Sequence, residues 1–376
     1  MIDNSKIVTS FRNLIAYEQT NDSQIPQLDT SLLSTSETQQ TVQKLHPILS
    51  LLNIYMCWDK NGAFSDFLNG LRDASIKKLI SALYTQKNIN QINKQLLSET
   101  SMWEGSGNFH DLIIGQGRFV GLKIYSTEKD VSLIINRIGI QISAANATLP
   151  IYIYHSSQSD PLYSLTINQN KVNSFSWYTV PQMVLPYIEG GYYVLGYYED
   201  DITGQAINRR DNLMLPPCSC DPVNNSLWQK WSKFTKFEPI FIQNGHIKND
   251  KTKWEESDQN YTNNTNFGIN VTISAVCDIT DLICRNKFLF VEALGKQITK
   301  DLIEVLKFNT SDNSIKEMLA SDTMAALYGD GNGKVGVEYD YREAMKALSF
   351  EISDLNPVCL PCDNNQFRIR QSTVYR

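Results

Sequence analysis

The chain has 376 residues; 42% of them are apolar and 20% are charged, and the formal net charge is −6. This length and apolar fraction predict a globular protein of two or three domains and argue against a disordered chain. The acidic balance argues against tight binding of nucleic acid, because phosphate contacts need clustered Lys and Arg. The same charge balance is compatible with DNA that passes through a central channel without being tightly bound.

Asn, Ser, Gln and Thr take the place of charged residues, which predicts a polar but weakly charged surface. Such a surface is common where a protein contacts other proteins, and a codon bias toward Asn, Ile, Lys and Tyr explains it equally well. The first residues carry no basic segment followed by an apolar run, so no signal peptide is predicted. No apolar stretch reaches the roughly 18 residues of a membrane span, so we expect no membrane partner.

Residues 1–100 are predicted to be mainly helical, because their apolar residues recur at helical spacing. The clearest helix covers residues 64–83, and a short helix is predicted over 89–97. Residues 18–40 are polar and rich in Ser, Thr and Gln, which favours a mobile linker.

Residues 105–210 are predicted to form an antiparallel β-sandwich of jelly-roll type. They contain about six or seven short runs rich in Val, Ile, Tyr, Phe and Trp, each bounded by Gly, Pro, Asn, Asp or Ser. In one run, Ile151 and Ile153 alternate with Tyr152 and Tyr154, as in a strand with one buried face. A set of such strands is typical of a sandwich, which is a binding or structural architecture before it is a catalytic one.

Residues 211–376 are predicted to be a mixed but mainly helical region. The polar stretch 208–226 indicates a domain boundary or a long functional loop. A long amphipathic helix is predicted over 281–308, and an extended tail over 355–376 is expected either to lie on a neighbouring subunit or to fray. The expected fold is therefore multidomain α+β, with the sandwich between two helical regions.

The seven cysteines are an odd number, and a chain of this length does not need a disulfide scaffold. Cys57, Cys277 and Cys284 lie alone in apolar stretches and are predicted to be core thiols. The other four form two close pairs that could together hold a structural zinc ion or form a disulfide cluster; no other cofactor is predicted. These four are Cys218, Cys220, Cys359 and Cys362. Unlinked thiols are the alternative, because the two pairs lie far apart in the sequence.

The aromatic residues of the predicted strands suggest a second kind of site. Alternation places part of them on the outer face of the sandwich. There, rings such as those of Tyr154 and Trp177 could stack on a sugar, as in carbohydrate-binding sandwiches. Core packing and contacts between subunits explain the same rings equally well.

Three consecutive acids, Glu199, Asp200 and Asp201, could supply carboxylates for acid–base chemistry on a glycoside. No second acid is singled out by its context, so a solvated strand end is the better interpretation. The histidines lack the spacing of metal ligands, and no nucleophile elbow, P-loop or dinucleotide fingerprint occurs. We therefore expect no enzymatic activity.

Several segments of the chain together form a recognisable series. They are WDKNGAFSDFLNGLRDASIKKLISALYT (58–85), GRFVGLKIY (117–125), INRIGIQIS (135–143), LPIYIYHSSQ (149–158), GGYYVLGYYEDDITGQAI (190–207), VCDITDLICRNKFLFVEALGKQ (276–297) and VCLPC (358–362). The series resembles a family of uncharacterised proteins of phages and prophages of Bacteroidetes, and it is similar to the neck or ring proteins of crAss-like tailed phages. The resemblance covers most of the chain.

The resemblance implies a non-enzymatic virion protein that is a subunit of a cyclic ring at the head–tail junction, with about 12 copies per ring. The expected partners are further copies, the portal and neighbouring neck or tail proteins. The expected location is the virion, assembled in the host cytoplasm. The shared motifs are strand cores, helix faces and turns, so they transfer no catalytic residue. A glycan-binding adhesin or receptor-binding sandwich protein is the alternative, and a glycoside-acting enzyme is a third hypothesis.

Overall fold

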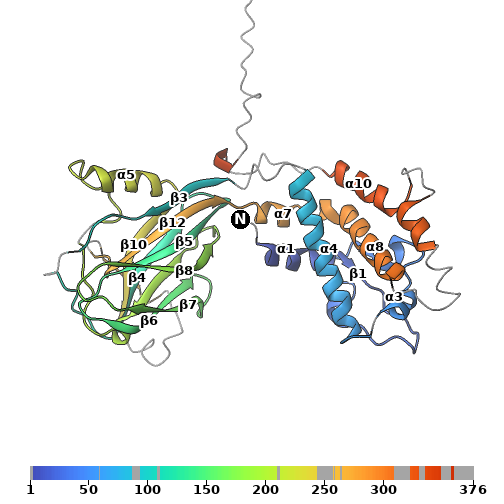
Figure 1. Ribbon diagram of the computed structural model, residues 1–376, viewed down its shortest axis with the longest axis horizontal. Coiled ribbons are helices and arrows are strands. Elements are labelled where there is room, and N and C mark those ends of the chain that lie inside the picture. The colour runs from blue at the N-terminus through green and yellow to red at the C-terminus, as the bar shows by residue number, and fades with distance from the viewer. Residues whose placement is uncertain are drawn as a thin grey trace, which may run out of the picture. The chain divides into compact units, whose positions relative to one another are not determined.

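The computed structural model contains two compact units (Figure 1). The sandwich unit comprises Asn93–Asp278 and Leu355–Arg376, and the helical unit comprises Ile2–Ile92 and Ile279–Asp354. The residues that the structure describes are 3–58, 60–86, 94–107, 111–209, 212–243, 257, 259–262, 265–308, 322–329, 335–348 and 357–359.

Two antiparallel sheets make up the sandwich unit. Their strands are β3 (Gln95–Ser101), β4 (Arg118–Ser126), β5 (Val131–Ile140), β6 (Asn146–His155), β7 (Pro161–Gln169), β8 (Ser176–Leu185), β9 (Tyr193–Tyr198), β10 (Thr235–Gln243), β11 (Gln259–Tyr261) and β12 (Ile269–Cys277). The six-stranded sheet has the order β11-β10-β4-β9-β6-β7, and the four-stranded sheet has the order β3-β12-β5-β8. Strands that are distant in the sequence therefore become neighbours, as β3 and β12 do.

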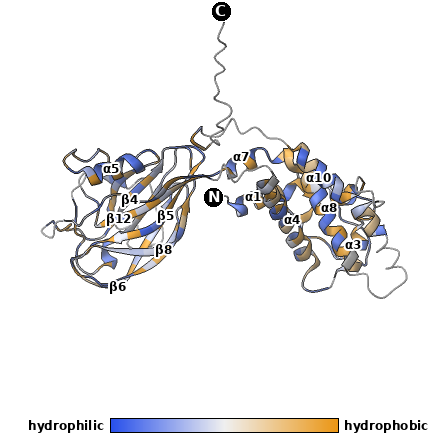
Figure 2. Cartoon of the chain, turned by 45° about the horizontal axis from the view of Figure 1, so that its top comes forward, coloured by the Kyte–Doolittle hydropathy of each residue, from blue (hydrophilic) through white to orange (hydrophobic). Residues whose placement is uncertain are grey.

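The core of this unit lies between the two sheets, and apolar residues run along the strands of both (Figure 2). Leu122, Ile151 and Leu195 of the six-stranded sheet join Ile135 and Ile273 of the four-stranded sheet in one buried cluster. Burial of a side chain of this size contributes about 1.5–3 kcal/mol. The contact between the sheets is therefore the main stabilising feature of the unit.

The alternation predicted along β6 is confirmed. Ile151 and Ile153 lie in the core between the sheets, whereas Tyr152 and Tyr154 belong to a second cluster that includes Tyr198. Because successive side chains of a strand point to opposite faces, this second cluster covers the outer face of the six-stranded sheet.

The helical unit is built around α8 (Val291–Phe308), against which α4 (Phe64–Gln86) and α10 (Val337–Ala347) pack. The buried side of α8 carries apolar residues at helical spacing, from Leu294 to Leu306. The unit also contains α1 (Asn4–Phe11), α2 (Val42–Leu45), α3 (Leu51–Cys57), α7 (Thr280–Arg285) and a two-strand parallel pair, β1 (Ile15–Ala16) and β2 (Gln40–Thr41).

The predicted class is confirmed, with N-terminal helices, a central antiparallel sandwich and C-terminal helices. The predicted limits of the sandwich, 105–210, are too narrow, because β3 precedes them and β10, β11 and β12 follow them. The region predicted as 211–376 is consequently divided between the two units at Asp278. Pairing between distant strands has no local signature, so the sequence did not reveal this boundary.

Two predicted helices are wrong in detail. The long helix predicted over 281–308 is interrupted: α7 ends at Arg285, a short 3-10 helix covers Lys287–Phe290, and α8 begins at Val291. The side chain of Asn286 lies at the break and donates to the Leu282 carbonyl at 2.9 Å. The helix predicted over 89–97 ends in strand β3, and its first part lies outside the described residues.

The segment predicted as a mobile linker, 18–40, is packed onto the helical unit. Ile25, Leu28 and Leu32 are buried, so its few apolar residues are anchors. The Asp29 amide also donates to Ser65 Oγ, next to the start of α4, at 3.1 Å. The polar composition of this segment reflects its exposed side only. Of the tail predicted over 355–376, only Pro357–Cys359 lies within the described residues, as a single 3-10 turn.

A buried carboxylate connects α4 to α8. Asp301 of α8 is 6% exposed and accepts hydrogen bonds from Ser75 Oγ at 2.6 Å and Lys78 Nζ at 2.7 Å. Gln297, one turn earlier on α8, donates to the same carboxylate at 3.0 Å. Gln297 is itself buried and relies on Asp301 as the acceptor of its side-chain amide, whereas the buried Ser75 hydroxyl also lies 3.0 Å from the Leu71 carbonyl.

We expect Asp301→Ala to destabilise the helical unit by about 2–3 kcal/mol, because the buried Gln297 amide loses its acceptor and the hydrogen bonds from Ser75 and Lys78 of α4 are lost. Urea unfolding followed by circular dichroism measures this loss. The control is Lys77→Ala, which removes an exposed side chain from α4 and should leave the transition within about 0.5 kcal/mol. Equal losses of unfolding free energy in the two variants would contradict the role given to Asp301.

Candidate functional site

The candidate site of the sandwich unit surrounds Trp103, in the segment that follows β3. The Trp103 side chain lines two neighbouring hollows, and it is only 4% exposed. We call them the outer groove, on the four-stranded sheet, and the α5 pocket, beside helix α5 (Pro222–Trp231). Both are built entirely from residues of the sandwich unit.

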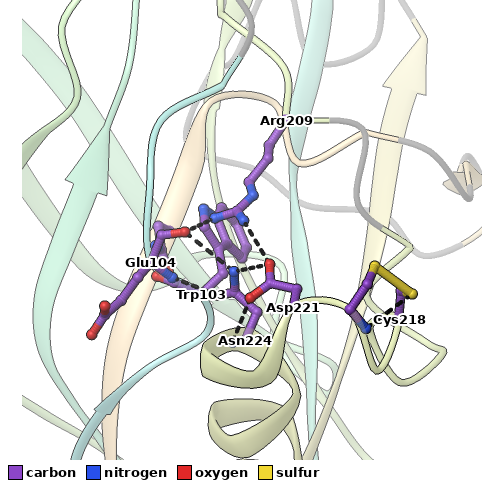
Figure 3. Close-up of polar contacts among 8 residues, drawn as sticks. Trp103, Glu104, Arg209, Cys218, Asp221 and Asn224 are labelled. Atoms are coloured by element: carbon purple, nitrogen blue, oxygen red, sulfur yellow. Dashed lines mark hydrogen bonds and ion pairs between the residues drawn. A yellow bond between two sulfur atoms is a disulfide. The ribbon is translucent and has the colours of Figure 1, made fainter.

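A polar network holds the wall of the α5 pocket (Figure 3). The Arg209 guanidinium lies 5.7 Å from the centre of the Trp103 ring, donates to the Glu104 carbonyl and comes within 4.0 Å of the Asp221 carboxylate. The Asn224 side chain accepts from the Glu104 amide at 2.7 Å and donates to Asp221 at 2.6 Å. Three segments that are distant in the sequence are thereby joined around one ring.

Helix α5 is fixed at both of its ends. Asp221 caps its N-terminus by accepting from the Asn224 amide at 3.1 Å, and Pro222 follows at the first helical position. Hydrogen bonds from the side chain and backbone of Asn224 hold the pKa of Asp221 below its usual value. At the other end, Trp231 Nε1 donates to the Met102 carbonyl at 3.0 Å. The helix therefore has one position relative to the segment that carries Trp103.

The α5 pocket is small and has a mixed polar and apolar lining. It encloses about 290 Å³ between α5 and the loop that precedes it. Besides the polar network, its lining consists of Asn212, Cys218 and large apolar and ring side chains: Met102, Trp103, Leu213, Leu215, Pro216, Pro217, Trp228 and Trp231. Met214 and Leu215 are 51% and 59% exposed beside it, so the apolar surface continues out of the pocket.

The outer groove encloses about 600 Å³ over the outer face of the four-stranded sheet. Arg137 of β5 forms an ion pair with Glu99 of β3 and lies 5.3 Å from the centre of the Trp177 ring. The Phe175 ring meets Trp177 edge-on at 5.1 Å, and Glu99 also accepts from Thr272 Oγ1 at 3.1 Å. Leu227 and Lys230 of α5, with Glu104 and several hydroxyl side chains, complete the lining.

Of the four cysteines predicted to form one cluster, the three within the described residues are not brought together. Cys218 is bonded to Cys220, whereas Cys359 is bonded to Cys277, at the end of β12. The prediction that Cys277 is a lone core thiol is therefore wrong as well. Because the chain returns to the sandwich unit at Pro357–Cys359, Cys359 meets β12 and not the loop before α5. Cys362 lies outside the described residues.

The two aromatic residues predicted to bind a glycan have different positions. Tyr154 is 1% exposed, and its hydroxyl lies 2.9 Å from that of Tyr198. Its ring packs edge-on against Phe119, so it is part of the cluster on the six-stranded sheet and is not available to a ligand. Trp177 is partly exposed and lies in the outer groove. The sequence did not single out Glu99, Arg137 or Trp103.

The acidic triplet after β9 has structural partners. Glu199 is nearly buried and accepts two hydrogen bonds of 2.7 Å from the Arg118 guanidinium. This pairing raises the pKa of Arg118 above its usual value. Asp200 accepts from the Gly117 amide at 2.9 Å. The prediction that this triplet is a solvated strand end is therefore wrong for Glu199, whose ion pair joins β4 to the end of β9.

In comparisons with known proteins, no family model, no curated protein and no solved structure matches this chain. Among the helices within the described ranges, none has the length and apolar character needed to cross a membrane. In the same part of the chain, no group of three or more His, Cys, Asp or Glu side chains could hold a metal ion.

We expect Asn224→Ala to lower the stability of the sandwich unit by about 1–3 kcal/mol, because the buried amide is shared by Glu104 and Asp221. Amide exchange at Glu104 should become faster, since its acceptor is lost. Hydrogen exchange followed by mass spectrometry measures both effects. Ser226→Ala removes an exposed side chain from the same helix and serves as the control; an equal change there would refute the role of Asn224.

The cap formed by Asp221 predicts a pH dependence. Because the pKa of Asp221 is lowered in the folded state, its ionised form stabilises the fold above the unfolded pKa of about 3.9. That contribution is lost as the pH falls through the lower folded pKa. The melting temperature of the protein should therefore exceed that of Asp221→Asn at pH 6, and the two should converge in acid. A difference that stays constant down to the folded pKa would contradict this account.

Proposed function

We propose that the protein is a non-enzymatic structural subunit of a closed ring at the head–tail junction of a tailed bacteriophage. The resemblance of its segments to the neck proteins of crAss-like phages suggests the location. The proposed partners are further copies, the portal and adjoining neck or tail proteins, with DNA passing through the lumen. The protein would assemble in the host cytoplasm and remain in the virion.

The observation that carries this proposal is a pair of exposed apolar patches, one on each unit. The sandwich patch consists of Leu215, which lines the α5 pocket, Met214, which precedes it, and Val223 in the first turn of α5; Met214, Leu215 and Val223 are 51%, 59% and 49% exposed. The helical patch consists of Phe288 and Leu289, which are 51% and 52% exposed. Large apolar side chains gathered at the surface favour contacts with another protein.

Two different patches are what a ring requires. A two-fold dimer uses the same patch on both subunits, whereas a head-to-tail contact joins one patch to a different one and closes into a ring when the rotation allows it. We assign the sandwich patch of one copy to the helical patch of the next. The weakly charged surface supports this assignment, because interface cores are depleted in charged residues.

Two interface variants test the head-to-tail contact. Leu215→Asp and Leu289→Asp each place a carboxylate in one patch, so each variant alone should remain monomeric in analytical ultracentrifugation. An equimolar mixture should form a heterodimer and nothing larger. The intact helical patch of the first variant can meet the intact sandwich patch of the second, and both ends of that dimer are then blocked.

Val172→Asp is the control, because Val172 is 54% exposed but lies outside both patches. This variant should assemble like the unmodified protein. Two outcomes would contradict the proposal: assembly of both patch variants as large oligomers, or the absence of a heterodimer from their mixture.

A further inference from the structure

We propose that the outer groove binds a neutral oligosaccharide chain, with Trp177 as the surface on which a sugar ring stacks. This site does not depend on ring assembly. It uses one of the two aromatic residues that the sequence suggested, in surroundings that only the fold creates.

The side chains of the groove match the chemistry of a sugar. A pyranose has an apolar face of C–H groups and a rim of hydroxyls, and the indole of Trp177 offers an apolar surface to the former. The Glu99 carboxylate and the Arg137 guanidinium lie beside that ring, and their side chains are 44% and 41% exposed. The Glu99 carboxylate can accept a hydrogen bond from one hydroxyl of the sugar, and the Arg137 guanidinium can donate a hydrogen bond to another.

The charges of the groove favour an uncharged ligand. Its lining contains two acids, Glu99 and Glu104, and two bases, Arg137 and Lys230, so their formal charges cancel. A polyanion such as a nucleic acid or an acidic polysaccharide would need an excess of cations. The remaining polar lining consists of hydroxyl side chains, Ser98, Thr100, Ser101, Ser106 and Thr272.

The groove is formed before any ligand binds. Three adjacent strands supply Glu99, Thr272 and Arg137, and the ladder between them fixes their spacing. Arg137 is held by its ion pair with Glu99 and by Trp177, so neither charge needs to be ordered on binding. The volume of about 600 Å³ lies in the range of small-ligand sites and is large enough for a chain of several sugar units.

The test is isothermal titration of the full chain with neutral hexasaccharides: cellohexaose, laminarihexaose, maltohexaose, mannohexaose and xylohexaose. We expect at least one of them to bind with a dissociation constant below about 1 mM. Trp177→Ala should weaken this binding at least about tenfold, because the stacking surface is lost. Ser98→Leu should weaken it similarly by filling the groove from the exposed side of β3.

Tyr261→Ala is the matched aromatic control, since Tyr261 is 58% exposed on the six-stranded sheet. The affinity of this variant for the hexasaccharide should equal that of the unmodified chain. Melting curves of all variants establish that they are folded, and Ser98→Leu keeps the groove testable if Trp177→Ala does not fold. The inference is overturned if no hexasaccharide binds, or if binding survives in folded variants of the groove.

Discussion

The sandwich unit depends on the pairing of β12 along both of its edges. From Ile269 to Cys277 this strand pairs with β5, and its other edge pairs with β3. The strand also fixes the segment after β3: the Val271 carbonyl accepts from the Met102 amide at 3.1 Å, and Asn270 Nδ2 donates to the Trp103 carbonyl at 2.9 Å. Trp103 and its neighbours in turn position α5. Both hollows therefore exist because a strand late in the sequence inserts between two earlier ones.

The same strand lies where the chain passes between the units. The Cys277 amide donates to the Lys94 carbonyl at the start of β3, and Cys359 returns to Cys277 through a disulfide. Lys94, Cys277 and Cys359 are thus held together at one end of β3 and β12. A disulfide that closes a long loop restricts the unfolded chain, which stabilises the folded unit. The apolar patches that we assign to the ring contact belong to separate units, each with its own core.

The sequence predicts where the strands lie better than it predicts which strands pair with one another. Alternation in β6 and the apolar runs of β4, β5 and β9 are local signals, and they identified the sandwich. Strand β3 was missed because LLSETS contains no clear alternation and acquires its structure from β12. Tyr154 was expected at the surface because alternation shows which residues share a face, but not whether other rings cover that face. Glu99 and Arg137 are ordinary surface charges in the sequence, and only strand pairing brings them to Trp177.

The central claim is that the chain forms a closed ring through two different surfaces. Native mass spectrometry of the unmodified protein, recorded over a wide range of concentrations, tests it most directly. We predict one large species whose mass is a fixed multiple of 42.8 kDa and whose copy number does not change with concentration, because a closed ring has no free end. A monomer at every concentration, a dimer that never grows, or an open series of increasing sizes would contradict the account.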